Sequence, residues 1–490
     1  MEKSASIGKS AVKLTASKMI VLAISMVTAM LLSRFRTVEE YGTYSQLLMV
    51  INLVTTIIMM GLPNSLNYFL AGADTKEERS HFLNVYYSLS TILSLVVGVV
   101  LVLITPLLVD YFDNPMITSF IYFLAVFPWT KIIMASVENV LVVYNRTNLI
   151  MAFRLLNSVS LLGIILVVQL LSWDFNSYMI LYLVVETIFT ISVYFIAKQS
   201  AGKLRIEFDL ALTKKIFKFS IPLGIASMLG TLNIELAKLV IGGLMDTESL
   251  AIFTNASKEM PVTIIASSIT AVLLPQMVRL LKKGENQNAA KLWSDATYIS
   301  FTIICFIAFA LFVFAPEVMT LLYSEKYLAG VSVFRIYSLV LLLRCTYFGM
   351  VLNASGHSKF IFYSSVASLV LNLIFNYAFF YAFGFVGPAI ASLLAQLIIN
   401  AVQLLWTSKV IKIRFTKLFK WSQLGLSLLI NIILASVFAL LKYALPLENN
   451  VGELFESIGL GCIWGIVFIV VMFKSLKNHW VSLNSQKTNS

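Results

Sequence analysis

The chain has 490 residues, of which 59% are hydrophobic and 12% charged, and its mean hydropathy is +0.88. Soluble domains are nearer half apolar and a quarter charged, so this composition excludes an ordinary soluble protein and predicts one whose solvent is largely lipid. The net charge of +12 would suggest a nucleic-acid partner in a soluble protein, but here the positions of the basic residues explain it better.

Hydrophobic runs separated by short polar breaks predict an all-α membrane protein with about 14 transmembrane helices, each near the length that crosses a bilayer. The first run follows a basic N-terminus, but it is too long for a cleaved signal peptide and is read as an uncleaved helix. The predicted spans are 12–33, 42–62, 83–108, 116–143, 149–171, 178–197, 216–244, 250–278, 292–314, 331–354, 360–382, 386–408, 421–441 and 452–473.

The loops between these spans differ sharply in basic residues. With fourteen spans both termini lie on one side, and nearly all the Lys and Arg of the loops belong to that side. The opposite loops hold only Arg34, Arg36 and Lys326. The positive-inside rule therefore predicts a multi-pass protein of the bacterial cytoplasmic membrane with both termini in the cytoplasm.

Breaks between spans recur at a fixed distance, which indicates an internal repeat. Thr105-Pro106 and Ala315-Pro316 each end a long span and lie 210 residues apart. Two copies that both begin on the cytoplasmic side form a parallel repeat about an axis along the membrane normal. The expected domains are an N-lobe at 1–198, a cytoplasmic linker at 199–215, a six-helix C-lobe at 216–408, two extra helices at 409–475 and a cytoplasmic tail at 476–490.

Several cations fall inside predicted spans, where a charge costs about 2.5–3.5 kcal/mol on insertion scales and needs a reason. An excess of cations in a hydrated cavity between the two lobes would attract an anion, and phosphate suits Lys and Arg donors. Lys131 and Arg344 fall at comparable places in the two copies. The candidate substrate-binding residues are Lys18, Lys131, Arg154, Lys238, Lys258 and Arg344.

Carboxylates inside the spans are fewer, and Glu138, Glu186 and Glu235 are candidates for ion coupling or pairing. Glu235 and Lys238 are three residues apart on one helix, so a structural ion pair is an equally good interpretation. Glu138 shares a helix face with Lys131 but lies two turns away, so each is expected to meet water or another helix.

Signs of enzymatic chemistry are absent from the sequence. Its three histidines are scattered, no cluster of His, Cys and carboxylates has metal-ligand spacing, and no nucleophile motif or cofactor-binding motif is present. The sequence therefore predicts neither an enzyme nor a metal or cofactor, and it predicts no nucleic-acid partner.

The motifs of the chain resemble those of a Wzx-type polysaccharide-unit flippase, in the multidrug/oligosaccharidyl-lipid/polysaccharide exporter superfamily. The resemblance covers nearly the whole chain and rests on the order and spacing of short stretches: YGTY (41–44), FSIPLGIAS (219–227), LPQM (274–277), EKYLAG (325–330), LNASGHS (352–358) and FGFVGPAIAS (383–392). Many members place an acid directly before the lysine of the seventh span. Here that position is Ala237, and the acid is Glu235.

The resemblance implies a two-lobed transporter that alternates between inward-open and outward-open states. Its substrate would be an undecaprenyl-diphosphate-linked oligosaccharide, carried to the outer leaflet for capsule, exopolysaccharide or O-antigen synthesis. Membrane lipids, a polysaccharide polymerase and a chain-length regulator are candidate partners. The alternatives are a lipid II or teichoic-type precursor flippase, a cation-coupled multidrug exporter, and a membrane-embedded glycosyltransferase or ligase acting on the same lipid carrier.

Overall fold

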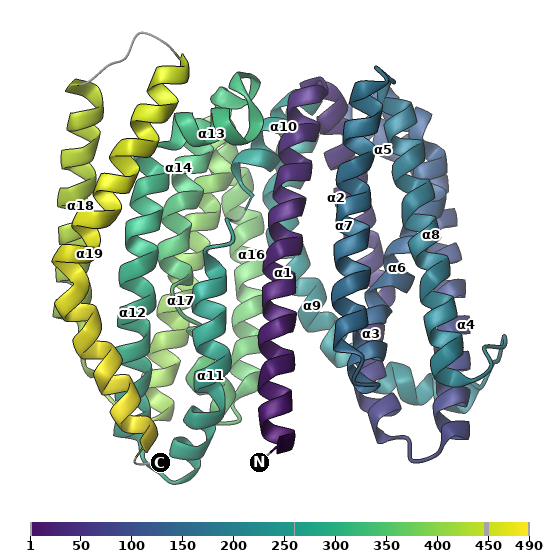
Figure 1. Cartoon of the computed structure of the whole chain (residues 1–490), viewed down its shortest axis with the longest axis horizontal. Helices are drawn as coiled ribbons and strands as arrows, with labels where there is room; N and C mark the ends of the chain where they lie inside the picture. Colours follow the sequence, from purple (N-terminus) through teal and green to yellow (C-terminus); the bar gives the residue numbers. More distant parts are fainter. Residues whose placement is uncertain (1, 259, 445–449, 489–490) are drawn as a thin grey trace. The chain divides into compact units, whose positions relative to one another are not determined.

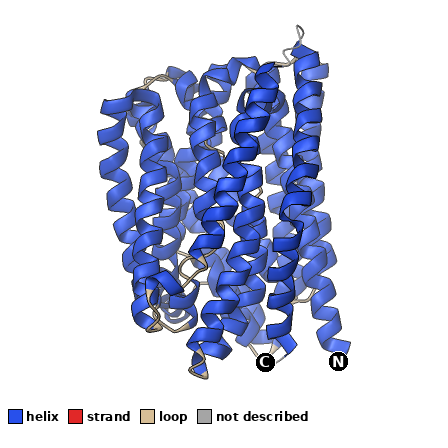
Figure 2. Ribbon diagram, turned by 90° about the vertical axis from the view of Figure 1, so that its left-hand side faces the viewer, coloured by secondary structure: helices blue, strands red, loops and turns tan. Residues whose placement is uncertain are grey.

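The computed structural model describes residues 2–258, 260–444 and 450–488, and every regular element in these ranges is helical (Figure 2). Thirteen segments of this part are long and apolar enough to cross a membrane. One of them, residues 359–410, contains two helices, α16 (Ser358–Phe383) and α17 (Gly387–Val410), separated by the turn η5 (Gly384–Val386). The prediction of an all-α membrane protein with about fourteen spans is confirmed.

The chain forms two compact units, Met1–Ala251 and Ile252–Ser490. Figure 1 labels most of their helices. Unit 1 contains α1 (Glu2–Phe35), α2 (Val38–Met59), α3 (Leu62–Ser65), η1 (Leu66–Leu70), α4 (Lys76–Leu103), α5 (Thr105–Phe112), η2 (Pro115–Phe120), α6 (Ile121–Val143), α7 (Thr147–Leu170), α8 (Phe175–Ala201), α9 (Leu210–Leu244) and the first half of α10 (Thr247–Ala256).

Unit 2 begins within α10 and, in its described residues, contains two interrupted spans and five further long helices. Besides α16, η5 and α17 it contains α11 (Thr263–Lys282), α12 (Asn286–Val313), α13 (Ala315–Tyr323), η3 (Glu325–Gly330), α14 (Val331–Val340), η4 (Leu341–Arg344), α15 (Met350–Ala354), η6 (Phe415–Lys417), α18 (Trp421–Ala444) and α19 (Asn450–Thr488). The expected tail at 476–490 is therefore helical as far as residue 488, and 489–490 lie outside the described residues.

Short polar sequences set where the long helices of unit 1 begin. The Thr37 hydroxyl accepts a hydrogen bond from the Glu40 amide at 3.1 Å, and the Glu40 carboxylate accepts one from the Thr37 amide at 3.0 Å. Thr75 and Glu78 form the same reciprocal cap at the start of α4. Such caps satisfy amides that have no partner inside the helix, and they fix where a span leaves its loop.

The helix α9 packs against α2, α3 and α5, which places it in unit 1. The closest approach involves two glycines: a Cβ atom on Gly224 would lie 2.1 Å from the carbonyl carbon of Met60. Gly61 has a φ of +72°, which lets the chain turn sharply beside α9. The compact units therefore divide at 251 and not within the expected linker, while the repeat-based lobe boundaries stay a prediction.

The segment between α8 and α9 runs along α4 in an extended form. The Glu207 carboxylate contacts His81 Nδ1 at 2.7 Å and accepts a hydrogen bond from the Asn84 amide at 2.9 Å. The Asp209 carboxylate contacts His81 Nε2 at 3.1 Å and caps the first turn of α9. These contacts attach residues 203–209 to α4, so α9 begins at 210, earlier than the predicted 216.

Helix boundaries recur between the units at the spacing found in the sequence. The helices α4 and α12 begin 210 residues apart and end 210 residues apart, and the same interval separates η2 from η3 and the start of α6 from the start of α14. The internal repeat is thus visible as matching elements. The copies also differ, because α2 and α6 are continuous whereas the elements at the matching positions, α10–α11 and α14–α15, are interrupted.

A buried carboxylate joins three helices of unit 2. Asp295 of α12 is fully buried and accepts hydrogen bonds from Ser482 Oγ at 2.7 Å and Lys420 Nζ at 3.0 Å, and it contacts His479 Nδ1 at 2.9 Å. Lys420 directly precedes α18, while His479 and Ser482 belong to α19. This cluster attaches the two extra helices to α12.

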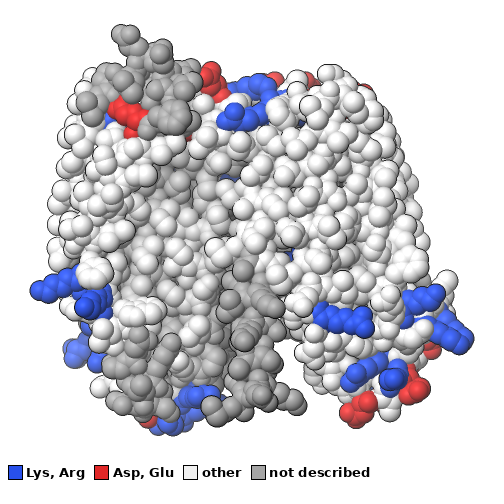
Figure 3. All heavy atoms as spheres, viewed as in Figure 1, with Lys and Arg blue, Asp and Glu red and all other residues white. Residues whose placement is uncertain are grey.

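Charged side chains lie mainly near the ends of the helices. On the face shown in Figure 3, Lys, Arg, Asp and Glu gather at the two ends of each unit and leave a nearly uncharged band between them. An uncharged band of this kind is what a hydrocarbon layer requires. The charges that do lie within the spans are therefore exceptions that need a physical explanation.

Candidate functional site

Lys131 and Glu138 of α6 belong to two different clusters. The Lys131 ammonium donates a hydrogen bond to the side-chain oxygen of Asn52, in the middle of α2. Glu138 lies seven residues further along α6, about 10 Å along the helix axis, and contacts other helices. The prediction that Lys131 and Glu138 each contact another helix, and not each other, is confirmed.

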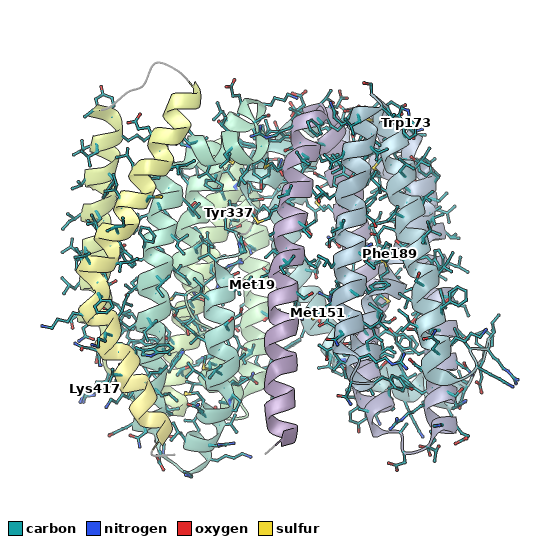
Figure 4. All side chains as sticks on the ribbon, viewed as in Figure 1. Met19, Met151, Trp173, Phe189, Tyr337 and Lys417 are labelled. Atoms are coloured by element: carbon teal, nitrogen blue, oxygen red, sulfur yellow. The ribbon has the colours of Figure 1, made fainter. Side chains whose placement is uncertain are left out.

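Glu138 bridges two cations from two other helices. One of its oxygens, Oε1, lies 2.8 Å from Lys18 Nζ of α1. The other, Oε2, accepts a hydrogen bond from Arg154 Nη2 of α7. Figure 4 labels Met19 and Met151, which lie within one turn of Lys18 and Arg154, at a similar level along α1 and α7. Three helices thus meet at one carboxylate inside the membrane-spanning part of unit 1.

Two further carboxylates of unit 1 are buried and bonded. Glu235 lies 2.8 Å from Lys238 Nζ on the same helix, α9, so the direct ion pair that the spacing allowed is present. Glu186 of α8 accepts a hydrogen bond from the Asn157 amide of α7 at 3.0 Å. The carboxylate of Glu186 is therefore satisfied by a neutral donor, whereas that of Glu235 is neutralised by a cation.

In unit 2 the two remaining predicted cations lie where membrane-spanning helices are interrupted. The eighth span was predicted as one helix over 250–278, but α10 ends at Ala256 and α11 starts at Thr263. Pro261 lies in this interval, and a proline cannot donate the backbone hydrogen bond that a continuous helix requires. Lys258 lies within the interruption.

The tenth span was predicted as one helix over 331–354 and is interrupted as well. After α14, the chain tightens into η4, which ends at Arg344, and regular helix resumes only with α15. The Asn400 amide donates a hydrogen bond to the Leu343 carbonyl at 2.7 Å, which satisfies a backbone acceptor that the interruption frees. Irregular backbone at membrane depth persists only where protein buries it or where it lines a cavity.

Lys258 and Arg344 line one pocket together with Met260, Tyr337 and Ser338. Tyr337 and Ser338 lie on α14, just before the interruption, and Figure 4 labels Tyr337. The pocket therefore combines two cations with two hydroxyl groups. Apolar residues including Phe334 and Leu341 line the pocket as well, and its volume of about 20 Å³ has room for roughly one water molecule.

The six predicted cations thus fall into three environments. Lys18, Arg154 and Lys238 contact carboxylates, Lys131 contacts a neutral amide, and Lys258 and Arg344 line the pocket of unit 2. Among the residues that the structure describes, no group of three or more His, Cys, Asp or Glu could hold a metal ion.

Sequence reasoning missed the amides Asn52 and Asn157, which contact Lys131 and Glu186. Each is an asparagine inside a largely apolar span, and such residues commonly make hydrogen bonds between membrane helices. The two asparagines are visible in the sequence, but the sequence does not show which residues they contact. The two interruptions were missed as well, although Pro261 marks one of them.

Comparison with known proteins gives a family for this arrangement. Residues 31–332, more than half of the chain, match the family described as polysaccharide biosynthesis protein. The chain belongs to this family. It is also 28% identical over 174 residues to the capsular polysaccharide biosynthesis protein CapF of Staphylococcus aureus, a match that covers 34% of this chain and 44% of that relative's length.

Solved structures share the fold over most of the chain. The lipid II flippase MurJ in an inward closed conformation superposes with a TM-score of 0.77 and 15% identity, over 94% of this chain and 99% of that one. An inward-facing multidrug resistance MATE family transporter of the MOP superfamily has a TM-score of 0.64 and 17% identity, over 82% and 98%. These likenesses establish the fold.

Proposed function

We propose that this chain flips undecaprenyl-diphosphate-linked oligosaccharide repeat units from the inner to the outer leaflet for the synthesis of a cell-surface polysaccharide. The observation that carries the proposal is Lys131, a cation on a membrane-spanning helix that donates its hydrogen bond to the neutral Asn52 amide. Cations inside the membrane are costly and mark substrate or ion pathways. A phosphate oxygen would give Lys131 the negative counter-charge that the neutral Asn52 amide does not supply.

The balance of charge supports an anionic substrate. Unit 1 contains four of the predicted cations and the three carboxylates Glu138, Glu186 and Glu235, and in unit 2 two more cations line the pocket with Tyr337 and Ser338. A cavity with excess positive charge raises the local concentration of anions. The diphosphate of the carrier would contact the cations, and hydroxyl and amide side chains would accommodate the sugars.

The mechanism that we propose is alternating access, with the lipid tail remaining in the bilayer during the flip. We place the chain in the bacterial cytoplasmic membrane with both termini in the cytoplasm, because Lys and Arg concentrate in the loops on that side. A polysaccharide polymerase and a chain-length regulator remain candidate partners, since repeat units delivered to the outer leaflet must be joined there.

A lipid II or teichoic-type precursor flippase is the second candidate, supported by the structural likeness to MurJ. The description of the matching family favours repeat units of a surface polysaccharide over lipid II. A multidrug exporter is disfavoured, because Lys18 places a cation on α1 within reach of Glu138, where a carrier of cationic drugs would favour an unpaired acid.

Depletion of the protein tests the proposal. In a strain whose surface polysaccharide requires this chain, depletion should cause lipid-linked repeat units to accumulate on the inner leaflet, detected by lectin binding to inverted membrane vesicles. Complementation with Lys131→Ala should fail, while complementation with Lys417→Ala, which removes an exposed lysine of η6 (Figure 4), should succeed. Unchanged surface polysaccharide without accumulation would refute the proposed function.

A further inference from the structure

Glu138 occupies the position between two cations that an anionic ligand would otherwise take. Its two oxygens contact Lys18 of α1 and Arg154 of α7, so one carboxylate uses both of its acceptor atoms to join three helices. A phosphate group offers the same kind of acceptor oxygens and more negative charge. The contacts of Glu138 are therefore contacts that a diphosphate could replace.

The cluster is open enough for an incoming ligand. The side chains of Lys18 and Arg154 are 48% and 33% exposed, and that of Glu138 is 22% exposed. In contrast, the Glu235 side chain of the other ion pair in unit 1 is 7% exposed. A second anion can therefore approach the Lys18 and Arg154 side chains without displacing buried side chains. At the buried Glu235 pair it would have to displace them.

The helix α1 depends on this cluster for its polar attachment to α6. It packs chiefly on α7, only 11% of its membrane-spanning window is buried, and Met19 and Ile20 beside Lys18 are exposed. Loss of the contact between Lys18 and Glu138 would therefore free the middle of α1 from α6 while its packing on α7 remains. A ligand that takes over Lys18 would change the position of α1.

We propose that Glu138 is a resident counter-anion that the diphosphate of the substrate displaces from Lys18 and Arg154. This inference rests on the proposed function and assigns Glu138 a role in setting affinity. The displaced carboxylate remains negatively charged near the bound diphosphate, so it weakens binding and speeds release. A transport site needs such a balance, because a ligand must bind well enough to enter and weakly enough to leave.

Lipid binding to purified protein in nanodiscs tests the role of Glu138. The probes are undecaprenyl diphosphate and undecaprenol, which lacks phosphate. Glu138→Gln keeps the shape of the side chain but removes the competing charge, so undecaprenyl diphosphate should bind about tenfold more tightly, and affinity for undecaprenol should not change. Glu77→Gln, an exposed acid in the first turn of α4, serves as the control and should leave both affinities unchanged.

A second variant and a cellular measurement separate displacement from misfolding. Glu138→Asp keeps the charge but is one methylene shorter, so its affinity for undecaprenyl diphosphate should lie between those of the wild type and Glu138→Gln. Cells with Glu138→Gln should export repeat units more slowly, because release becomes limiting. Equal or weaker binding of undecaprenyl diphosphate by correctly assembled Glu138→Gln would overturn the inference and leave the proposed function intact. Failure of the wild type to prefer undecaprenyl diphosphate over undecaprenol would instead contradict the proposed function.

Discussion

Replacement of Asp295 by alanine should destabilise unit 2 strongly. The carboxylate is fully buried in α12 and contacts Lys420, His479 and Ser482. A hydrogen bond to a charged group contributes about 1.5–3 kcal/mol and a neutral one about 0.5–1.5 kcal/mol. The Lys420 side chain is 45% exposed, so water can replace its partner and its ion pair adds roughly 1 kcal/mol or less.

His479 accounts for most of the expected loss of unfolding free energy, because water cannot reach it to replace the carboxylate. The His479 side chain is 7% exposed, and Asp295→Ala leaves its Nδ1 without an acceptor. The contacts together amount to about 3–4 kcal/mol of unfolding free energy. For a unit of this size, each kcal/mol lowers the melting temperature by roughly 2–4 °C, so we expect a decrease of about 6–16 °C.

The assay is thermal unfolding in detergent micelles, followed by the fraction that remains monodisperse in fluorescence-detected size-exclusion chromatography. Asp295→Asn keeps an acceptor for Ser482 and His479 and should lose less than Asp295→Ala. Ser482→Ala removes only one of the three contacts of Asp295 and should lower the melting temperature by only a few degrees. A melting temperature of Asp295→Ala within 1 or 2 °C of the wild type would refute the reasoning that the cluster attaches α18 and α19 to α12.

Three further predictions concern the other described features. Gly224→Leu should reduce the yield of folded protein, measured by the same chromatography, because even a Cβ atom there would lie 2.1 Å from the Met60 carbonyl carbon. Gly230→Leu is the control, because a Cβ atom at that position meets nothing within 4 Å. Lys131→Ala and Arg344→Ala should each abolish export while membrane insertion stays normal, and normal export in both would contradict a cationic substrate path. His81→Ala should speed trypsin cleavage after Lys203 and Arg205 at neutral pH. The hydrogen bond from Asn84 and the contact with His81 hold the pKa of Glu207 below its ordinary value of 4.5, so the attachment should persist from pH 7 to pH 5 and weaken only at lower pH. Hydrogen exchange of 203–209 that increased already between pH 7 and pH 5 would contradict that assignment.

Much of the fold was predictable because membrane helices follow simple rules of length and hydropathy. The spans, the interval of 210 residues and the helical break just before Thr105-Pro106 all depend on local patterns, and matching boundaries appear in α4 and α12. The direct pair of Glu235 and Lys238 was predictable for the same reason, because a separation of three residues on a helix fixes their distance.

Contacts between distant helices were not predictable in this way. Nothing local indicates that Glu138 contacts Lys18 and Arg154, since its partners come from α1 and α7 and depend on how three helices pack. The end of α14 at Val340 was also hidden, because the residues that follow are apolar helix formers and the Asn400 amide that supports the interruption belongs to α17. The packing of α9 in unit 1 depends on close approach at Gly224 and likewise has no local signal.

The interruption of two spans in unit 2 changes how the two copies of the repeat can recognise a ligand. In unit 1 the continuous helices α2 and α6 use their main-chain groups internally, so only side chains such as Lys131 are offered to a ligand. Around Lys258 and Arg344 the chain leaves regular helix, so main-chain groups there need partners outside the helix, as the Leu343 carbonyl has in the Asn400 amide. A mutational scan that replaces side chains would therefore measure recognition by unit 1 and underestimate that by unit 2, where substitutions that restore a continuous helix, such as Pro261→Ala, are the informative ones.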